Sequence, residues 1–208
     1  VRLLGEFNSK ISRLVRYQPA PFIYERLGGR YQHFFLDEFQ DTSELQWENL
    51  IPLLANSLES QNFSGVNGSL LLVGDPKQAI YRWRGGNMEQ YIDLINKVKN
   101  PFHVEAELFS LNKNFRSGEE IVSFNNDFFL FLSKYFDKLK YQNMYGKESQ
   151  QKAQNKGGYV RIETILNGVK DITTPLYISK TLTFISKIIS QGYLEGDIAI
   201  LVRKKEQG

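Results

Sequence analysis

Three apolar stretches of this 208-residue chain each end in polar side chains of the kinds that handle phosphates and metal ions. The first stretch, HFFL at residues 33–36, leads into two adjacent carboxylates, Asp37 and Glu38. A carboxylate at a strand end can hold Mg²⁺ through its water shell, and a second carboxylate beside it can orient and deprotonate an attacking water. An isolated acidic pair is usually a solvated turn. Here the apolar run before it and the hydrogen-bonding residues after it favour a nucleotide site.

The second and third stretches bring further groups suited to a nucleotide. The second, LLLVGD at residues 70–75, continues as PKQAIYRWRGG, in which Gln78 offers an amide that can donate one hydrogen bond and accept another. The third ends near Leu111 and leads into NFRS at residues 114–117. Because the carboxyl ends of parallel strands meet at one edge of a sheet, the three ends predict a single nucleotide site there.

Aromatic and basic residues alternate in the segment that follows Gln78. Tyr81 and Trp83 are interleaved with Arg82 and Arg84. Bases of single-stranded DNA stack on aromatic faces with about 1–3 kcal/mol each, while arginines meet phosphates or stack themselves. In an extended segment the two aromatic residues would share one side and the two arginines the other. A core role for Trp83 and a structural role for Arg84 are the alternatives.

Helices and strands are expected to alternate along the chain and to position these residues. An N-cap at Ser43 should begin the second helix, and the continuous Leu/Val run of the second strand predicts burial on both of its faces. A polar Asn/Ser/Gly stretch over residues 56–69 predicts a loop. In chain order we expect helices over residues 3–17, 45–54, 88–98 and 119–136, and strands over residues 33–38, 70–74 and 107–111.

Composition changes after the fourth helix. Gln, Asn, Lys, Ser and Gly dominate residues 138–158, which predicts an exposed linker and a domain boundary. Beyond it we expect a strand over residues 159–165, a helix over 174–191 and a strand over 197–202, the opening βαβ of a second α/β unit. The basic cluster Lys134, Lys138, Lys140 and Lys147 is interpreted as a solvated face. The aromatic run Phe124, Phe128, Phe129, Phe131, Tyr135 and Phe136 is interpreted as core.

Composition excludes several other classes of protein. The chain has no cysteine, which rules out disulfides and thiolate metal sites, and its two histidines, His33 and His103, are too few for a histidine-rich cluster. Lys and Arg total 26 against 23 Asp and Glu, a small excess that is compatible with nucleic acid without arguing for it. The apolar runs are far too short to span a membrane, and no signal-peptide layout is present. A soluble cytoplasmic protein is the expectation.

Three blocks of sequence resemble one known family in the same order. The block DEFQDTS at residues 37–43 resembles the Walker B motif of UvrD/Rep-type superfamily-one DNA helicases. Residues 74–85 resemble the next motif of that family, and residues 114–117 resemble the fourth. Lys77 and Arg82 make the second block more similar to the RecB/AddA recombination branch than to the UvrD branch.

The resemblance implies an α/β fold with a P-loop (RecA-like) parallel sheet flanked by helices. In this interpretation residues 1–137 are the C-terminal part of a first RecA-like motor domain, residues 138–158 a linker and residues 159–208 the start of a second RecA-like domain. The weakly similar block DIAILVR at residues 197–203 would belong to that second domain.

The resemblance also implies roles for individual residues, with ATP and Mg²⁺ as the bound groups. Asp37 would hold Mg²⁺, Glu38 would act as general base and Gln78 would sense the γ-phosphate. Phe115 stands where the family usually has tyrosine and would stack on the adenine, since the substitution keeps the ring. Arg116 would reach the γ-phosphate as an arginine finger.

The resemblance further implies a partner. Tyr81, Trp83 and Arg84 would bind single-stranded DNA and couple it to the nucleotide. The expected parent protein is an ATP-dependent DNA helicase or translocase of repair or recombination, and its candidate protein partner is a nuclease subunit. Two rivals stay open: a non-catalytic DNA-binding or scaffold protein with a helicase-like fold, and an unrelated nucleotide hydrolase.

One element of such a motor is missing from this sequence. No Gly-x-x-x-x-Gly-Lys-Ser/Thr loop is present, and the single Gly-Lys pair, at residues 146–147, is followed by Glu148. We therefore expect the chain to be a fragment of a larger motor and to have negligible ATPase activity alone.

Overall fold

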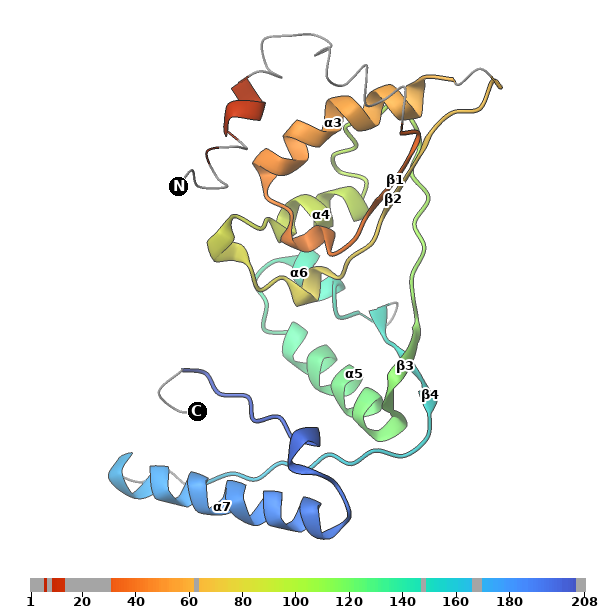
Figure 1. The fold of residues 1–208 in the computed structure, drawn as a ribbon. Coiled ribbons are helices and arrows are strands. Elements are labelled where there is room, and N and C mark those ends of the chain that lie inside the picture. Colours follow the sequence, from red (N-terminus) through yellow and green to blue (C-terminus); the bar gives the residue numbers. More distant parts are fainter. Residues whose placement is uncertain are drawn as a thin grey trace. The chain divides into compact units, whose positions relative to one another are not determined.

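In the computed structural model the chain forms two compact units, residues 1–158 and residues 159–208. Helices and strands alternate along the described chain (Figure 1), which confirms a mixed α/β class. The structure describes residue 6 and residues 9–13, 31–61, 64–146, 149–165 and 170–204. Most of the helix expected over residues 3–17 lies outside these ranges, while residues 9–13 are helical.

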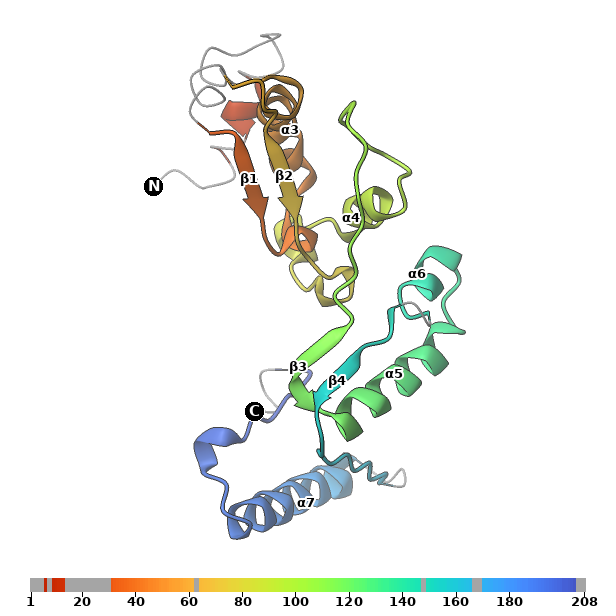
Figure 2. The same ribbon diagram turned by 90° about the vertical axis from the view of Figure 1, so that its right-hand side faces the viewer.

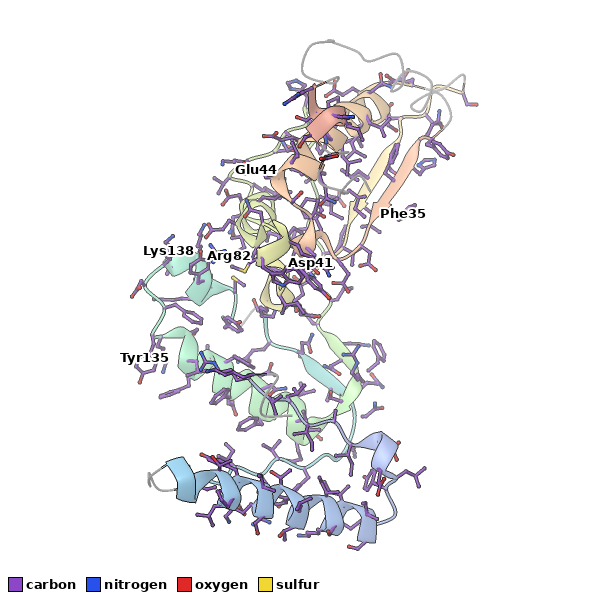
Figure 3. All side chains as sticks on the ribbon, turned by 60° about the vertical axis from the view of Figure 1, so that its left-hand side comes forward. Phe35, Asp41, Glu44, Arg82, Tyr135 and Lys138 are labelled. Carbon is purple, nitrogen blue, oxygen red and sulfur yellow. The ribbon has the colours of Figure 1, made fainter. Side chains whose placement is uncertain are left out.

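Strands β1 (His33–Leu36) and β2 (Ser69–Leu72) form a parallel pair in the first unit, in register from His33↔Ser69 to Leu36↔Leu72. Figure 2 shows the two arrows side by side with the same direction. The alternate residues Phe34 and Leu70 pack toward the core, whereas Phe35 is 72% exposed. Leu71 on β2 is likewise 46% exposed, so the expected burial of β2 on both faces is wrong; among the described residues, the core helices pack against the opposite face. Figure 3 shows Phe35 pointing away from them.

Helices α3 (Glu44–Glu59) and α4 (Met88–Ile95) build the core against that face. Ser43 caps α3 as predicted: its hydroxyl accepts from the backbone N–H of Gln46, whose side chain accepts from the Ser43 N–H. This helix runs to Glu59, so the loop expected from residue 56 begins later. The core cluster consists of Phe39, Trp47, Leu54 and Tyr91, and the Phe39 ring makes edge-to-face contacts with the rings of Trp47 and Tyr91.

A second parallel pair, β3 (Lys113–Gly118) with β4 (Lys152–Asn155), packs against α5 (Glu119–Ser133). The strand expected over residues 107–111 is wrong, because the strand begins at Lys113, where β4 offers a hydrogen-bonding partner. The segment 138–158, expected as a linker, contains α6 (Leu139–Asn143) as well as β4.

The surface of α5 differs from the expectation for its aromatic run. Phe124 and Phe128 stack with ring centroids 5.5 Å apart, but Phe131 and Tyr135 are 52% and 71% exposed. Phe128, Phe129 and Phe136 are exposed as well, so the interpretation of the run as core is wrong for every ring except that of Phe124. Figure 3 shows Tyr135 at the end of α5.

The second unit contains one long helix, α7 (Lys170–Ser190), close to the expected range. Residues 159–165 and 198–202 form no strand, although strands were expected over 159–165 and 197–202, because neither segment pairs with a strand in the described part of the chain. Glu163 instead binds Lys180 on the helix, with 2.8 Å between Nζ and Oε2, and also Arg161. In the described residues no helix is long and apolar enough to cross a membrane.

Helix α6 is fixed to α4 by a charged contact. Lys140 and Tyr141 donate hydrogen bonds to the two carboxylate oxygens of Glu89. Lys140 is thus paired, which corrects its interpretation as part of a solvated basic face. The hydrogen bond from Lys140 first, and then that from Tyr141, holds the pKa of the Glu89 carboxyl below its ordinary range.

This contact predicts a pH-dependent stability. Because the pKa of Glu89 is lower in the folded than in the unfolded chain, its contribution is present above about pH 4.3 and is lost as the pH falls through the folded-state pKa. We expect Glu89→Gln to lower the free energy of unfolding at neutral pH, with a difference that shrinks as the pH falls below about 4.3. Urea unfolding followed by the fluorescence of the buried Trp47 measures this. A pH-independent difference would contradict it, and the exposed Glu105→Gln is the control.

Candidate functional site

The carboxyl ends of β1 and β2 remain joined beyond the strands themselves. The N–H of Val73 donates to the carbonyl of Leu36 at 2.8 Å, and the N–H of Phe39 donates to the carbonyl of Val73 at 3.0 Å. Between these two bonds the chain turns at Glu38, which has φ = 50° and ψ = 42°. Non-glycine residues rarely adopt this left-handed conformation, and strained backbone of this kind clusters at active sites and ligand-binding turns.

The turn places the acidic pair at the sheet edge rather than within the strand. The expected strand over residues 33–38 ends at Leu36, and both Asp37 and Glu38 are exposed. Asp37 Oδ1 accepts a hydrogen bond from the Glu38 N–H at 2.9 Å. The conformation thus directs two carboxylates away from the core at the end of β1.

A buried amide connects this pair with the end of β2. Gln40 is 1% exposed; its Nε2 donates to Glu38 Oε2 at 2.6 Å, and its Oε1 accepts from the N–H of Asp75 at 3.0 Å. Sequence reasoning did not single out Gln40. The available signal in the sequence was a polar residue directly after the apolar Phe39. In the structure Phe39 is fully buried.

Gln78 joins the same edge through Asp75. Its Nε2 donates to Asp75 Oδ2 at 3.1 Å, while Asp75 Oδ1 accepts from the Lys77 N–H and binds Lys77 Nζ at 2.7 Å. The structure therefore brings Asp37, Glu38 and Gln78 to one edge of the β1–β2 pair, as the sequence predicted for them.

Phe115 and Arg116 lie on a different sheet. They belong to β3, which pairs with β4, so the expectation of three strand ends in one sheet is wrong for the third. Phe115 is 67% exposed, and the N–H of Arg116 donates to Asn114 Oδ1 at 3.0 Å. No contact of either side chain with Glu38 or Gln78 is found in the described part of the chain. Their approach to a nucleotide stays a prediction.

The basic–aromatic segment forms a turn of 3₁₀ helix (Arg82–Arg84) closed by Gly85 at φ = 89°, so the side-by-side alternation of an extended segment does not apply. In this turn the guanidinium of Arg84 lies over the Trp83 ring at 4.5 Å and over the Tyr81 ring at 5.1 Å, both measured to the ring centroid. Trp83 is 73% exposed, which excludes the alternative of a core tryptophan in this chain. Two rings and a guanidinium thus form a surface that can stack on bases.

This surface is connected to the acidic edge through the main chain. The carbonyl of Thr42 accepts from the N–H of Asn87 at 3.2 Å and from Gln90 Nε2 at 3.1 Å. Ser43 and Gly86 form an isolated antiparallel bridge. The segment that follows Glu38 therefore contacts the loop that carries Trp83, and Figure 3 shows Asp41 and Arg82 in this region.

The donor set fits a magnesium ion whose coordination is completed by phosphates. In the described residues no three His, Asp or Glu side chains cluster as a metal site. Mg²⁺, however, is usually held by one or two carboxylates together with substrate phosphates and water. Asp37 is exposed at the edge, and Asp41 Oδ1 is buried without a hydrogen-bond partner among the described residues. His33, by contrast, bonds to Ser69 at 2.9 Å across the strands, consistent with a structural role.

Comparison with known proteins finds a matching helicase family and several bacterial relatives. Residues 4–99 match the model of the UvrD/REP helicase N-terminal domain. The RecBCD enzyme subunit RecB of Chlamydia muridarum is 29% identical over 188 residues, covering 89% of this chain and 17% of that protein.

Two further relatives come from other bacteria. The exonuclease/helicase subunit RexA of Lactococcus lactis is 32% identical over 211 residues, covering 89% of this chain and 16% of that protein. DNA helicase II of Haemophilus influenzae is 35% identical over 111 residues, covering 53% of this chain and 13% of that protein. The chain thus spans about one sixth of the length of these relatives or less.

Proposed function

Since this chain belongs to the UvrD/REP helicase family, we propose that the full-length protein is an ATP-dependent DNA helicase or translocase that acts on single-stranded DNA in repair or recombination. The relatives named RecB and RexA favour a helicase–nuclease subunit. The observation that carries the proposal is the shared edge of β1 and β2, where Glu38 is connected to Gln78 through Gln40 and Asp75 and Asp37 accepts from the Glu38 N–H.

In this proposal each group at the edge has a separate task. Asp37 holds the Mg²⁺ that accompanies ATP, and the ion supplies charge neutralisation at the phosphates. Glu38 orients the attacking water and accepts its proton, and the Gln78 amide bonds the γ-phosphate or the water. Phe115 and Arg116 would contribute adenine stacking and transition-state charge stabilisation from the β3 side.

The DNA-binding task falls to the exposed turn. Tyr81, Trp83 and Arg84 present stacking faces and positive charge, and the contacts of Thr42 with Asn87 and Gln90 give a short route from the nucleotide edge to this turn. We assign residues 1–158, the first compact unit, to a first RecA-like domain, and residues 159–208 to part of a second.

The proposal is tested on the full-length protein by measuring ATP hydrolysis with and without single-stranded DNA. We expect hydrolysis that depends on Mg²⁺ and is stimulated by DNA, with DNA binding that weakens as salt rises because lysine and arginine contacts to phosphates release counterions. DNA binding without any hydrolysis would instead favour the non-catalytic scaffold protein. Hydrolysis that ignores DNA would favour an unrelated nucleotide hydrolase.

A further inference from the structure

The carboxylate of Glu38 is held by a side chain that is itself almost inaccessible. Gln40 Nε2 donates to one of its oxygens, Oε2, at 2.6 Å, and Gln40 is 1% exposed. Hydrogen bonds to an ionised carboxylate are short and roughly twice as strong as neutral ones. Because the carboxylate is planar, fixing Oε2 also restricts the direction of Oε1, the oxygen left for a water.

The position of Gln40 is fixed by its surroundings. A Cβ on Gly74 would lie 2.6 Å from Gln40 Oε1 and 3.0 Å from Tyr91 Cε1, so a larger residue at position 74 would displace the amide from its present place. Gln40 Oε1 accepts from the N–H of Asp75 at 3.0 Å. The amide is therefore bonded at both ends, to the end of β1 on one side and to the end of β2 on the other.

The same path of hydrogen bonds reaches the second group of the site. Asp75, whose N–H binds Gln40, accepts from Gln78 Nε2 through Oδ2 at 3.1 Å. Its other oxygen is occupied by Lys77. Three hydrogen bonds therefore connect the carboxylate of Glu38 with the amide of Gln78 through two intervening residues.

We propose that Gln40 is a positioning residue that orients the Glu38 carboxylate for hydrolysis and couples it to Gln78 through Asp75. The inference rests on the proposed function of this edge as an ATPase site. The amide of glutamine suits this position, because it can donate to a carboxylate and accept from a backbone N–H at the same time. A methionine of similar length can do neither, and a glutamate would place a second negative charge against Glu38.

The test uses the full-length protein and steady-state ATP hydrolysis with saturating single-stranded DNA. For Gln40→Met we expect kcat to fall at least about tenfold, the effect of losing one hydrogen bond to a charged group, with little change in the KM for ATP. For Gln40→Glu we expect a loss at least as large. In a Glu38→Gln background, Gln40→Met should cause almost no further loss of kcat, because Gln40 acts through the Glu38 carboxylate that is already gone.

Gln142→Met is the matched control. It also removes a partly buried amide, but that amide, on α6, donates to the carbonyl of Phe136 at 2.7 Å and does not contact Glu38. We expect it to keep kcat close to that of the wild type, with a fall in Tm similar to that of Gln40→Met.

The outcomes separate the two proposals. An inactive wild-type protein would overturn the proposed function and this inference together. An active wild type in which Gln40→Met keeps its kcat would overturn the inference alone. An equal loss of kcat in Gln142→Met would do the same, because it would show that the effect follows lost stability rather than the lost contact with Glu38.

Discussion

Replacing Glu38 by glutamine in the full-length protein is expected to reduce ATP turnover by about 10²- to 10⁴-fold, the usual contribution of a general base. Glutamine cannot accept the proton of the attacking water, yet it keeps the length of the side chain. Its carbonyl oxygen can still accept the hydrogen bond that Gln40 Nε2 now donates to Glu38. The loss should therefore appear in kcat, while binding of ATP and of single-stranded DNA is preserved.

The backbone at Glu38 makes this substitution a clean one. The left-handed conformation at φ = 50° strains any residue with a Cβ to a similar extent, so the change to glutamine leaves that strain nearly unaltered. Glu44→Gln, at an exposed position in the first turn of α3, is the matched control and should leave turnover unchanged. If the Glu38→Gln variant hydrolyses ATP at close to the wild-type rate, Glu38 is not the general base, and its role at the end of β1 is structural.

Local signals in the sequence predicted the local structure well. The Ser43 cap and the 3.6-residue periodicity behind it depend on residues a few positions apart, and α3 begins where they indicate. The same holds for α4 and α5, which lie within the expected ranges. The acidic pair and Gln78 were found because an apolar strand ending in polar groups is itself a local pattern.

Features that depend on distant partners were predicted less well. A strand exists only where another strand completes its hydrogen bonds, so residues 107–111 remain irregular and the strand forms opposite β4 instead. The role of Gln40 depends on the turn at Glu38 and on the absence of a Cβ at Gly74. The helix and strand propensities of single residues predict neither feature. The compact turn around Trp83 did have a signal, the pair Gly85 and Gly86, which favours a turn over an extended segment.

That compact turn changes how the basic–aromatic segment can meet DNA. In an extended strand the rings and the guanidiniums would face opposite sides, but here Arg84 lies over both Tyr81 and Trp83. The ring centroids of Tyr81 and Trp83 are 6.2 Å apart with planes inclined by 57°, so the two rings do not stack on each other. A base can therefore contact the Trp83 ring while Arg84 supports that ring and stays close to the phosphates.

Removing this ring by Trp83→Ala is expected to weaken binding of single-stranded DNA by about 5- to 150-fold, the equivalent of the roughly 1–3 kcal/mol that one stacked base contributes. DNA-stimulated ATP hydrolysis should fall far more than basal hydrolysis, because the nucleotide edge keeps its hydrogen bonds. The measurement is a DNA titration together with hydrolysis rates in the presence and absence of DNA. Tyr135→Ala, which removes another ring that is 71% exposed, controls for the loss of an exposed aromatic side chain.

The two rates decide between the roles of Trp83. Since Trp83 is 73% exposed and its contacts lie within its own turn, its removal should leave the core of Phe39, Trp47 and Tyr91 intact. Trp83→Phe keeps a smaller stacking face and should give an intermediate affinity. An equal loss of basal and stimulated hydrolysis in Trp83→Ala, together with a lower Tm, would show that this tryptophan supports the fold of the full-length protein instead of binding DNA.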